Sequence, residues 1–199
     1  MYPVVYLTGA PAAGKSTVAR GLSRTVRGLE VFEFGERLTA YINEQGATQH
    51  QQSDLRAKSS QISTAECVAA VDALLVDFAT NQRKAGPVVI DSHPVTKEAY
   101  GYRVTPYSLA DFARLAPTKI WMLYTSSSVA CARIAADPKG RPQISAEEAT
   151  MHTQLQASVA ATYSMSLGVP LELFDADRSL DELVEMLTLR LIDSGCERA

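Results

Sequence analysis

Short segments rich in large apolar residues recur along the 199-residue chain, separated by longer segments of mixed polarity. A continuous run such as Val88-Val89-Ile90 is typical of a strand that is buried on both faces of a sheet. In the longer segments, apolar residues return at every third or fourth position, the period of a helix that lies on a sheet. Strands and helices that alternate in this way predict an α/β fold of three layers with a central five-stranded parallel sheet. The predicted strands are 4–7, 29–34, 87–91, 119–124 and 170–174.

Two of the predicted helices carry long apolar stripes. One covers residues 61–84, and the other follows Ser179 near the end of the chain, where Gly195 is placed to terminate it. Ser145 and Ser179 are each followed by a glutamate three residues later, the capping-box pattern of a helix start. The residues expected to face the core from the two helices are Val68, Val71, Leu75, Phe78, Leu180, Leu183, Leu187 and Leu191.

Three segments are too polar to contribute much to the core. Residues 36–60 are helix-prone but have few large apolar side chains, which predicts a helical flap at the rim after a strand closed by Gly35. Residues 93–106 are rich in turn formers and predict an irregular loop. Residues 137–142 form a polar insert between two helices. With neither repeats nor a linker, residues 1–199 are expected to form a single domain.

Composition narrows the class of protein. Apolar residues make up 46% of the chain, charged residues 21%, and the net charge is −3 without a basic block, which argues against nucleic acid as a partner. Cys67, Cys131 and Cys196 are unclustered, so they indicate neither a disulfide framework nor a zinc site. Because no apolar run approaches the length needed to cross a membrane, we expect a cytoplasmic protein without a membrane partner.

The stretch after the first strand carries the most specific signal in the chain. A glycine, four residues and then Gly-Lys-Ser form the P-loop signature, in which backbone N–H groups at a helix start cradle phosphates. Lys15 would place a cation at the outer phosphates of ATP, and the Ser16 hydroxyl would bind Mg²⁺. The predicted ATP-binding residues are Gly9, Ala10, Pro11, Ala12, Ala13, Gly14, Lys15, Ser16 and Thr17.

Other candidate residues follow from the needs of phosphoryl transfer. Asp91 ends the third strand, where a carboxylate could also bind Mg²⁺. Arg133, Lys139 and Arg141 are cations in or beside the polar insert, which could close over the phosphates as a lid.

On the acceptor side, Arg56 and Arg103 could each grip a phosphate, and His93 could contact substrate. For each of the two arginines, an ordinary surface charge is the alternative. His50 is expected to be solvated and His152 to be structural.

The chain resembles the archaeal-type adenylate kinases, within the nucleoside-monophosphate kinases. The resemblance is closest in the P-loop and looser elsewhere, and it includes Arg133 and the spacing of His152 to Tyr163. The matching segments are Thr8-Gly9-Ala10-Pro11, Gly14-Lys15-Ser16-Thr17, Phe34-Gly35, Asp54-Leu55-Arg56, Val89-Ile90-Asp91-Ser92-His93, Gly101-Tyr102 and Tyr124-Thr125-Ser126-Ser127.

The resemblance implies a P-loop NTPase fold with an AMP-binding flap over 35–66 and a short lid over 134–145. It also implies Mg²⁺-dependent phosphate transfer from ATP to a nucleoside monophosphate, most often AMP, by an enzyme that is often a homo-oligomer. Arg133 would then border adenine, Arg141 the transferring phosphate and Arg56 the monophosphate. The chain departs from these kinases at Lys139-Gly140-Arg141, where they usually have two arginines, and at Gln156-Ala157, where they commonly have Asn-Arg.

Three functions remain open at this point. The first is a kinase of AMP or a related monophosphate, and the second is a kinase of another small molecule on the same fold. The third is a P-loop ATPase switch that acts with a protein or ribonucleoprotein partner.

Overall fold

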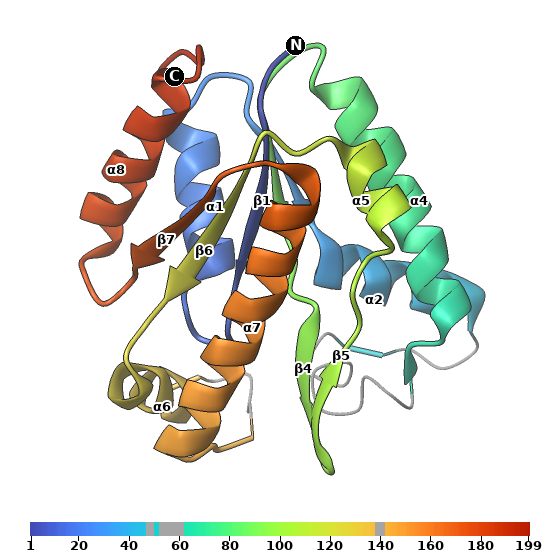
Figure 1. The fold of residues 1–199 in the computed structure, drawn as a ribbon, viewed down its shortest axis with the longest axis vertical. Helices are drawn as coiled ribbons and strands as arrows, with labels where there is room; N and C mark the ends of the chain where they lie inside the picture. Colours follow the sequence, from blue (N-terminus) through green and yellow to red (C-terminus); the bar gives the residue numbers. More distant parts are fainter. Residues whose placement is uncertain (47–49, 52–61, 138–141) are drawn as a thin grey trace.

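A computed structural model describes residues 1–46, 50–51, 62–137 and 142–199 (Figure 1). Its centre is a five-stranded sheet in the order β2-β3-β1-β6-β7, and each neighbouring pair of strands is parallel. The predicted central sheet is therefore confirmed. The strands are β1 (Val4–Gly9), β2 (Glu30–Glu33), β3 (Val88–Asp91), β6 (Lys119–Tyr124) and β7 (Leu171–Asp175).

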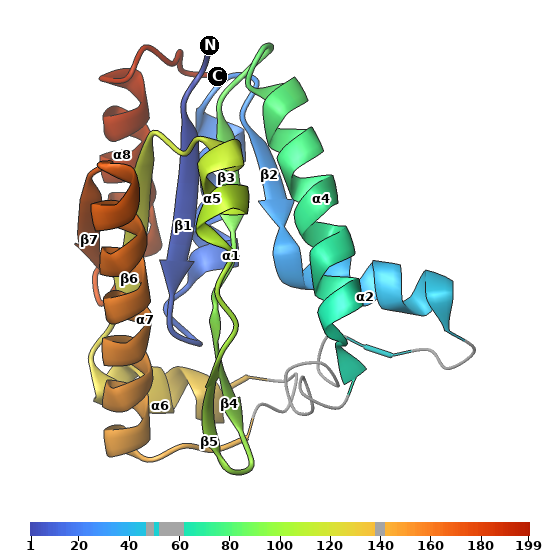
Figure 2. The ribbon, with the colours of Figure 1, turned by 45° about the vertical axis from the view of Figure 1, so that its right-hand side comes forward.

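Helices cover both faces of this sheet, which gives the three predicted layers (Figure 2). Alternate residues of β1 belong to different cores: Val4 and Tyr6 pack with one set of helices, and Val5 and Leu7 pack with the other. The first set is α4 (Ala65–Gln82), α5 (Leu109–Leu115) and α7 (Ala146–Leu167), and the second is α1 (Lys15–Thr25) and α8 (Leu180–Ile192). All residues of β1 are buried, as its apolar run requires.

The segment 93–106 is not the irregular loop that the sequence predicted. It forms an antiparallel hairpin of β4 (Val95–Glu98) and β5 (Gly101–Val104), which extends beyond the carboxyl ends of the central strands (Figure 1). Gly101 has a φ of 134°, a backbone conformation that L side chains rarely adopt, so this position at the tip favours glycine. The prediction failed because β4 has one apolar residue followed by three polar ones, so the sequence shows no alternation of polar and apolar positions. In the fold, Val95 and Glu98 are nevertheless both buried.

The polar segment after β2 contributes more to the core than expected. The helix α2 (Phe34–Gln45) begins directly after β2, so Gly35 lies inside a helix instead of ending a strand. Leu38 and Ile42, one turn apart, are buried against the side of the core that includes α4. Two apolar residues at helical spacing were enough to anchor an otherwise polar helix. The rest of the predicted flap lies partly outside the described residues.

Several predicted helix ends are confirmed and others shift. Ser145 and Ser179 both form capping boxes. The helix predicted from residue 61 is described as α4 from Ala65, with Thr64 as its N-cap. In α8, Leu180 is exposed because it is the first residue of the helix, whereas the other three predicted leucines are buried. Gly195 lies beyond the C-cap of α8, not directly after it.

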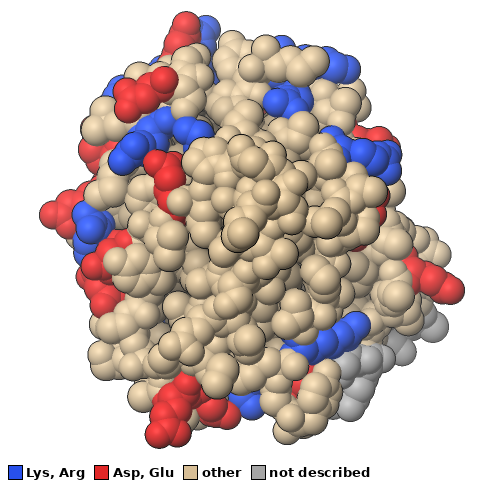
Figure 3. Space-filling view, in the orientation of Figure 1, with Lys and Arg blue, Asp and Glu red and all other residues tan. Residues whose placement is uncertain are grey.

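The surface carries charges of both signs. On the face shown in Figure 3, Lys and Arg side chains alternate with Asp and Glu around the edge, and the centre is mostly uncharged. Within the described residues, none of the helices combines the length and apolar character that a membrane span requires.

Candidate active site

The P-loop connects the end of β1 to the start of α1 at the carboxyl edge of the sheet. Gly9 has a φ of 148°, and a Cβ added there would lie 2.4 Å from the carbonyl oxygen of Leu123 on β6. Gly14 is the N-cap of α1 and has a φ of 85°, with open space where its Cβ would be. The first glycine therefore allows two strands to approach, and the second allows a turn that leaves room at the helix start.

Lys15, Ser16 and Asp91 meet beside this loop. The Lys15 Nζ donates a hydrogen bond to the Gly9 carbonyl oxygen at 2.8 Å. The Ser16 hydroxyl donates to the Asp91 Oδ2 at 2.6 Å, across 75 residues of sequence. Asp91 is buried, with 7% of its surface exposed. The predicted strand-end carboxylate thus lies next to the predicted serine of the P-loop, as the topology of a parallel sheet requires.

A second carboxylate, which the sequence analysis missed, lies beside Asp91. Glu33 ends β2 and is directly opposite Asp91 in the strand register. Burial raises the pKa of the Glu33 carboxyl, and the neighbouring Asp91 charge raises it further. The available signal was that two predicted strands, 29–34 and 87–91, each end at or near an acidic residue. At one edge of a parallel sheet, two such residues become neighbours.

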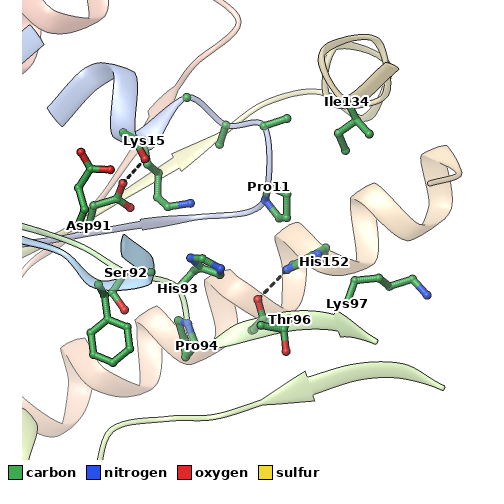
Figure 4. A pocket seen from close by; sticks show the side chains of 18 of the residues that line it. Pro11, Lys15, Asp91, Ser92, His93, Pro94, Thr96, Lys97, Ile134 and His152 are labelled. Atoms are coloured by element: carbon green, nitrogen blue, oxygen red, sulfur yellow. Dashed lines mark hydrogen bonds between the residues drawn. The ribbon is translucent and has the colours of Figure 1, made fainter. Parts of the chain in front are cut away.

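A cavity of about 900 Å³ opens in front of these groups. Pro11 and Lys15 lie on one wall, and His93, Pro94 and Thr96 lie on the wall opposite (Figure 4). The cavity is larger than the P-loop alone needs and falls within the range of small-molecule sites.

At one end of the cavity, Arg133 is bound to the backbone. Its Nη1 donates to the Ala12 carbonyl oxygen at 3.2 Å, and its Nη2 donates to the Ala176 carbonyl oxygen at 2.8 Å. Arg133 lies at the end of α6 (Ser127–Ala135), and Arg178 lines the same end. Ala176 and Arg178 follow the last strand and were not predicted as site residues.

The hairpin forms a second wall and is attached to α7. The Nε2 of His152 is 3.1 Å from the Val95 carbonyl oxygen, and the Tyr102 hydroxyl donates to the Glu148 carbonyl oxygen at 2.7 Å. Lys97 and Glu148 form an ion pair at 3.1 Å. Burial lowers the pKa of His152 to about 4, so the ring is neutral near pH 7, in line with the predicted structural role.

The other end of the cavity is lined by α2, α4, β5 of the hairpin and the segment after it. Phe34, Val68 and Tyr107 give it an apolar and aromatic surface, to which Arg103 and Asp72 add charges. The Asp72 Oδ1 is buried and, within the described residues, accepts no hydrogen bond. Asp72 was also missed by the sequence analysis.

The structure brings most of the predicted site residues to this one cavity. Arg56, Lys139 and Arg141 lie outside the described residues, and His93 lines the cavity from an exposed position. Gly9 and Ala10 belong to the loop without lining the cavity. The predicted residues that do line it are Pro11, Ala12, Ala13, Gly14, Lys15, Ser16, Thr17, Asp91, His93, Arg103 and Arg133.

Comparison with known proteins identifies the family. A family model described as an AAA domain matches residues 8–151, which include the P-loop, Asp91, the hairpin and Arg133. The chain belongs to this AAA domain family. The match begins in β1 and ends in α7, and it includes residues from both ends of the cavity. A search of the curated proteins finds no match.

Solved structures show the same fold as this AAA domain family member. The tunicamycin resistance protein of Deinococcus radiodurans is 16% identical, with a TM-score of 0.58 over 100% of this chain and 99% of that chain. A sugar kinase from Janibacter sp. HTCC2649 is 16% identical, with a TM-score of 0.57 over 97% and 95% of the two chains. The P-loop NTPase fold expected from the sequence is therefore confirmed, whereas the adenylate-kinase subtype stays a prediction.

Proposed function

We propose that this protein is a phosphotransferase that moves the γ-phosphate of ATP to a small-molecule acceptor. The observation that carries the proposal is the shared cavity, which joins the P-loop and Asp91 to a separate end lined by α2, α4 and the hairpin. An enzyme that only binds or hydrolyses ATP does not need this second end. The solved structures with the same fold include one described as a sugar kinase, which supports phosphate transfer as the activity.

The residues present fit the roles that ATP requires. The N–H groups at the start of α1 would bind the phosphates, and Lys15 would leave the Gly9 carbonyl oxygen to neutralise charge at the outer phosphates. Arg133 lines the cavity and donates a hydrogen bond to the Ala12 carbonyl oxygen of the P-loop, and the adenylate-kinase resemblance would put it beside the adenine of ATP. Arg141 remains the predicted lid cation for the transferring phosphate.

The groups around Ser16 also fit Mg²⁺. One hydroxyl and the carboxylates of Asp91 and Glu33 are oxygen donors, which Mg²⁺ prefers. The described residues contain no cluster of three or more His, Cys, Asp or Glu that could hold a metal alone, so the ATP phosphates would complete the ligand set. When bound, Mg²⁺ would neutralise charge that develops on the phosphates during transfer.

The acceptor would occupy the end lined by Phe34, Val68, Tyr107 and Arg103. One of its oxygen atoms would attack the γ-phosphorus while the bond from that phosphorus to the β–γ bridging oxygen breaks, and ADP leaves with the electron pair. The adenylate-kinase resemblance suggests AMP as this acceptor, and Arg103 would then face the monophosphate.

The proposal is tested by measuring ADP formation from Mg²⁺-ATP over a panel of nucleoside monophosphates, nucleosides and sugars, beside a control without acceptor. We expect at least one class of acceptor to raise the rate on the order of 10²-fold or more above the control. Mass spectrometry of the product would show the added phosphate. Equal ATP turnover with and without every acceptor would contradict transfer and favour an ATPase switch.

A further inference from the structure

Asp72 interrupts the apolar face of α4 at the acceptor end of the cavity. It lies one helical turn after Val68, which lines the cavity, and one turn before Val76, which is buried. Asp72 itself lines the cavity, as do Leu38 and Tyr107. A charged side chain therefore occupies a helix position that packing alone would fill with an apolar one.

One oxygen of the partly buried Asp72 carboxylate lacks the hydrogen bond that a buried polar atom normally has. Among the described residues, its Oδ1 is buried without a hydrogen bond, and none of the ion pairs includes Asp72. Burial raises its pKa to about 6, and the Asp111 charge adds to the effect. Because the group is still ionised near pH 7.5, the unpaired oxygen destabilises the protein unless a bound molecule supplies a donor.

We infer that Asp72 is a specificity-determining residue of the acceptor site and recognises two adjacent hydrogen-bond donors on the acceptor. The inference rests on the proposed function, because that function assigns this end of the cavity to the acceptor. A carboxylate offers two accepting oxygens and no donor, so a pair of neighbouring O–H or N–H groups matches it. The vicinal hydroxyls of a sugar and the N1–H and N2–H edge of guanine both have this chemistry.

The same chemistry works against the adenine base of AMP as the group that contacts Asp72. The adenine edge presents one donor beside one acceptor, so one adenine lone pair would face a carboxylate oxygen. A site whose polar group is left unpaired in this way discriminates strongly against the mismatched ligand. Replacing Asp72 with Asn would exchange one acceptor for a donor and make the site complementary to adenine instead.

Calorimetric titration of the full chain tests the inference, with Mg²⁺ and a non-hydrolysable ATP analogue present throughout. Two matched pairs are the probes: GMP against AMP, which share the ribose and differ in the base, and methyl ribofuranoside against methyl 2-deoxyribofuranoside, which lacks the vicinal hydroxyl pair. We expect the wild type to bind the member with two adjacent donors about 10-fold more tightly in one pair, and that pair identifies the source of the donors. In Asp72→Asn this preference should fall to about threefold or less.

Asp77→Asn is the matched control, because Asp77 is exposed on the same helix and does not line the cavity. It should keep the wild-type preference. Asp72→Ser serves as a second variant, and thermal unfolding checks that each variant folds. The inference is overturned if Asp72→Asn keeps the wild-type ratios in both pairs, if the wild type shows no preference, or if neither pair binds. Phosphate transfer to the tighter-binding compound is measured separately, so a failure of the proposed function is distinguished from a failure of this inference.

Discussion

Single side chains at the site differ in how their charges are balanced. Asp91 accepts a hydrogen bond from Ser16 and ends a buried strand. Glu33 faces Asp91 across the strand register, and the two carboxylates repel each other, which a bound Mg²⁺ would offset. Asp72 has neither a hydrogen bond to its buried oxygen nor a cation partner within the described residues. These carboxylates lie where bound ligands would supply what the protein does not.

The cost of the Asp72 charge can be measured as a pH dependence of stability. Because the folded-state pKa is raised from 3.8 to about 6, the folded protein holds this proton more strongly than the unfolded chain. The stability that this proton contributes to the folded protein is therefore fully present below pH 3.8 and is lost as the pH rises through about 6. After allowance for solvent screening, Asp72→Asn should raise the free energy of unfolding by about 1 kcal/mol at about pH 7.5.

Urea unfolding of both proteins at about pH 4 and about pH 7.5 provides the measurement. The difference between wild type and Asp72→Asn should be small at the lower pH, where the folded-state carboxyl is protonated. A wild type that is the more stable protein at about pH 7.5 would show that Asp72 has a stabilising partner.

At the scale of elements, the P-loop needs its two glycines for different reasons. A side chain at Gly9 would collide with the backbone of β6, whereas one at Gly14 would enter open space. Gly14→Ala should therefore cost only the backbone strain of a positive φ, about 1–2 kcal/mol, and Gly9→Ala should cost more than this. Thermal unfolding of the two variants side by side tests the difference. A larger loss of stability in Gly14→Ala would contradict the described loop geometry.

Elements also differ in how well the sequence predicted them. The central strands and the P-loop were predictable because a strand buried on both faces and a phosphate-binding turn each leave a local pattern of residues. The hairpin was not predictable, because the residues of β4 do not alternate between polar and apolar and because its last residue, Glu98, is a charged residue that is buried. Leu38 and Ile42 have helical spacing, but their burial depends on packing between α2 and α4, which only the folded chain provides.

The site residues divide in the same way, into those that a local sequence pattern predicts and those that depend on the folded sheet. Lys15, Ser16 and Asp91 could be predicted because the motif and the strand end both point to the carboxyl edge of the sheet. Glu33 required the order of strands, since β2 becomes a neighbour of β3 only in the folded sheet. Asp72 did leave a signal, an acidic residue on an apolar helix stripe four residues after Val68, and this signal can be read in other chains.

At the scale of the whole molecule, the cavity joins segments that are distant in sequence. The P-loop, the β3 end, the hairpin and the segment after β7 all reach it from the carboxyl edge of one sheet. The chain termini lie at the opposite end of the molecule (Figures 1 and 2). Additions at either terminus therefore lie away from the proposed binding site.

The central claim is that the loop before α1 binds the phosphates of ATP, and calorimetric titration with a Mg²⁺-bound, non-hydrolysable ATP analogue tests it most directly. We expect one molecule to bind per chain, and Lys15→Ala to weaken binding by about 10- to 100-fold, because a charged hydrogen-bond donor to the phosphates is lost. Lys84→Ala, which changes an exposed lysine just beyond the end of α4, should bind as the wild type does. Wild-type protein that does not bind the analogue, or Lys15→Ala protein that binds it equally tightly, would contradict the account.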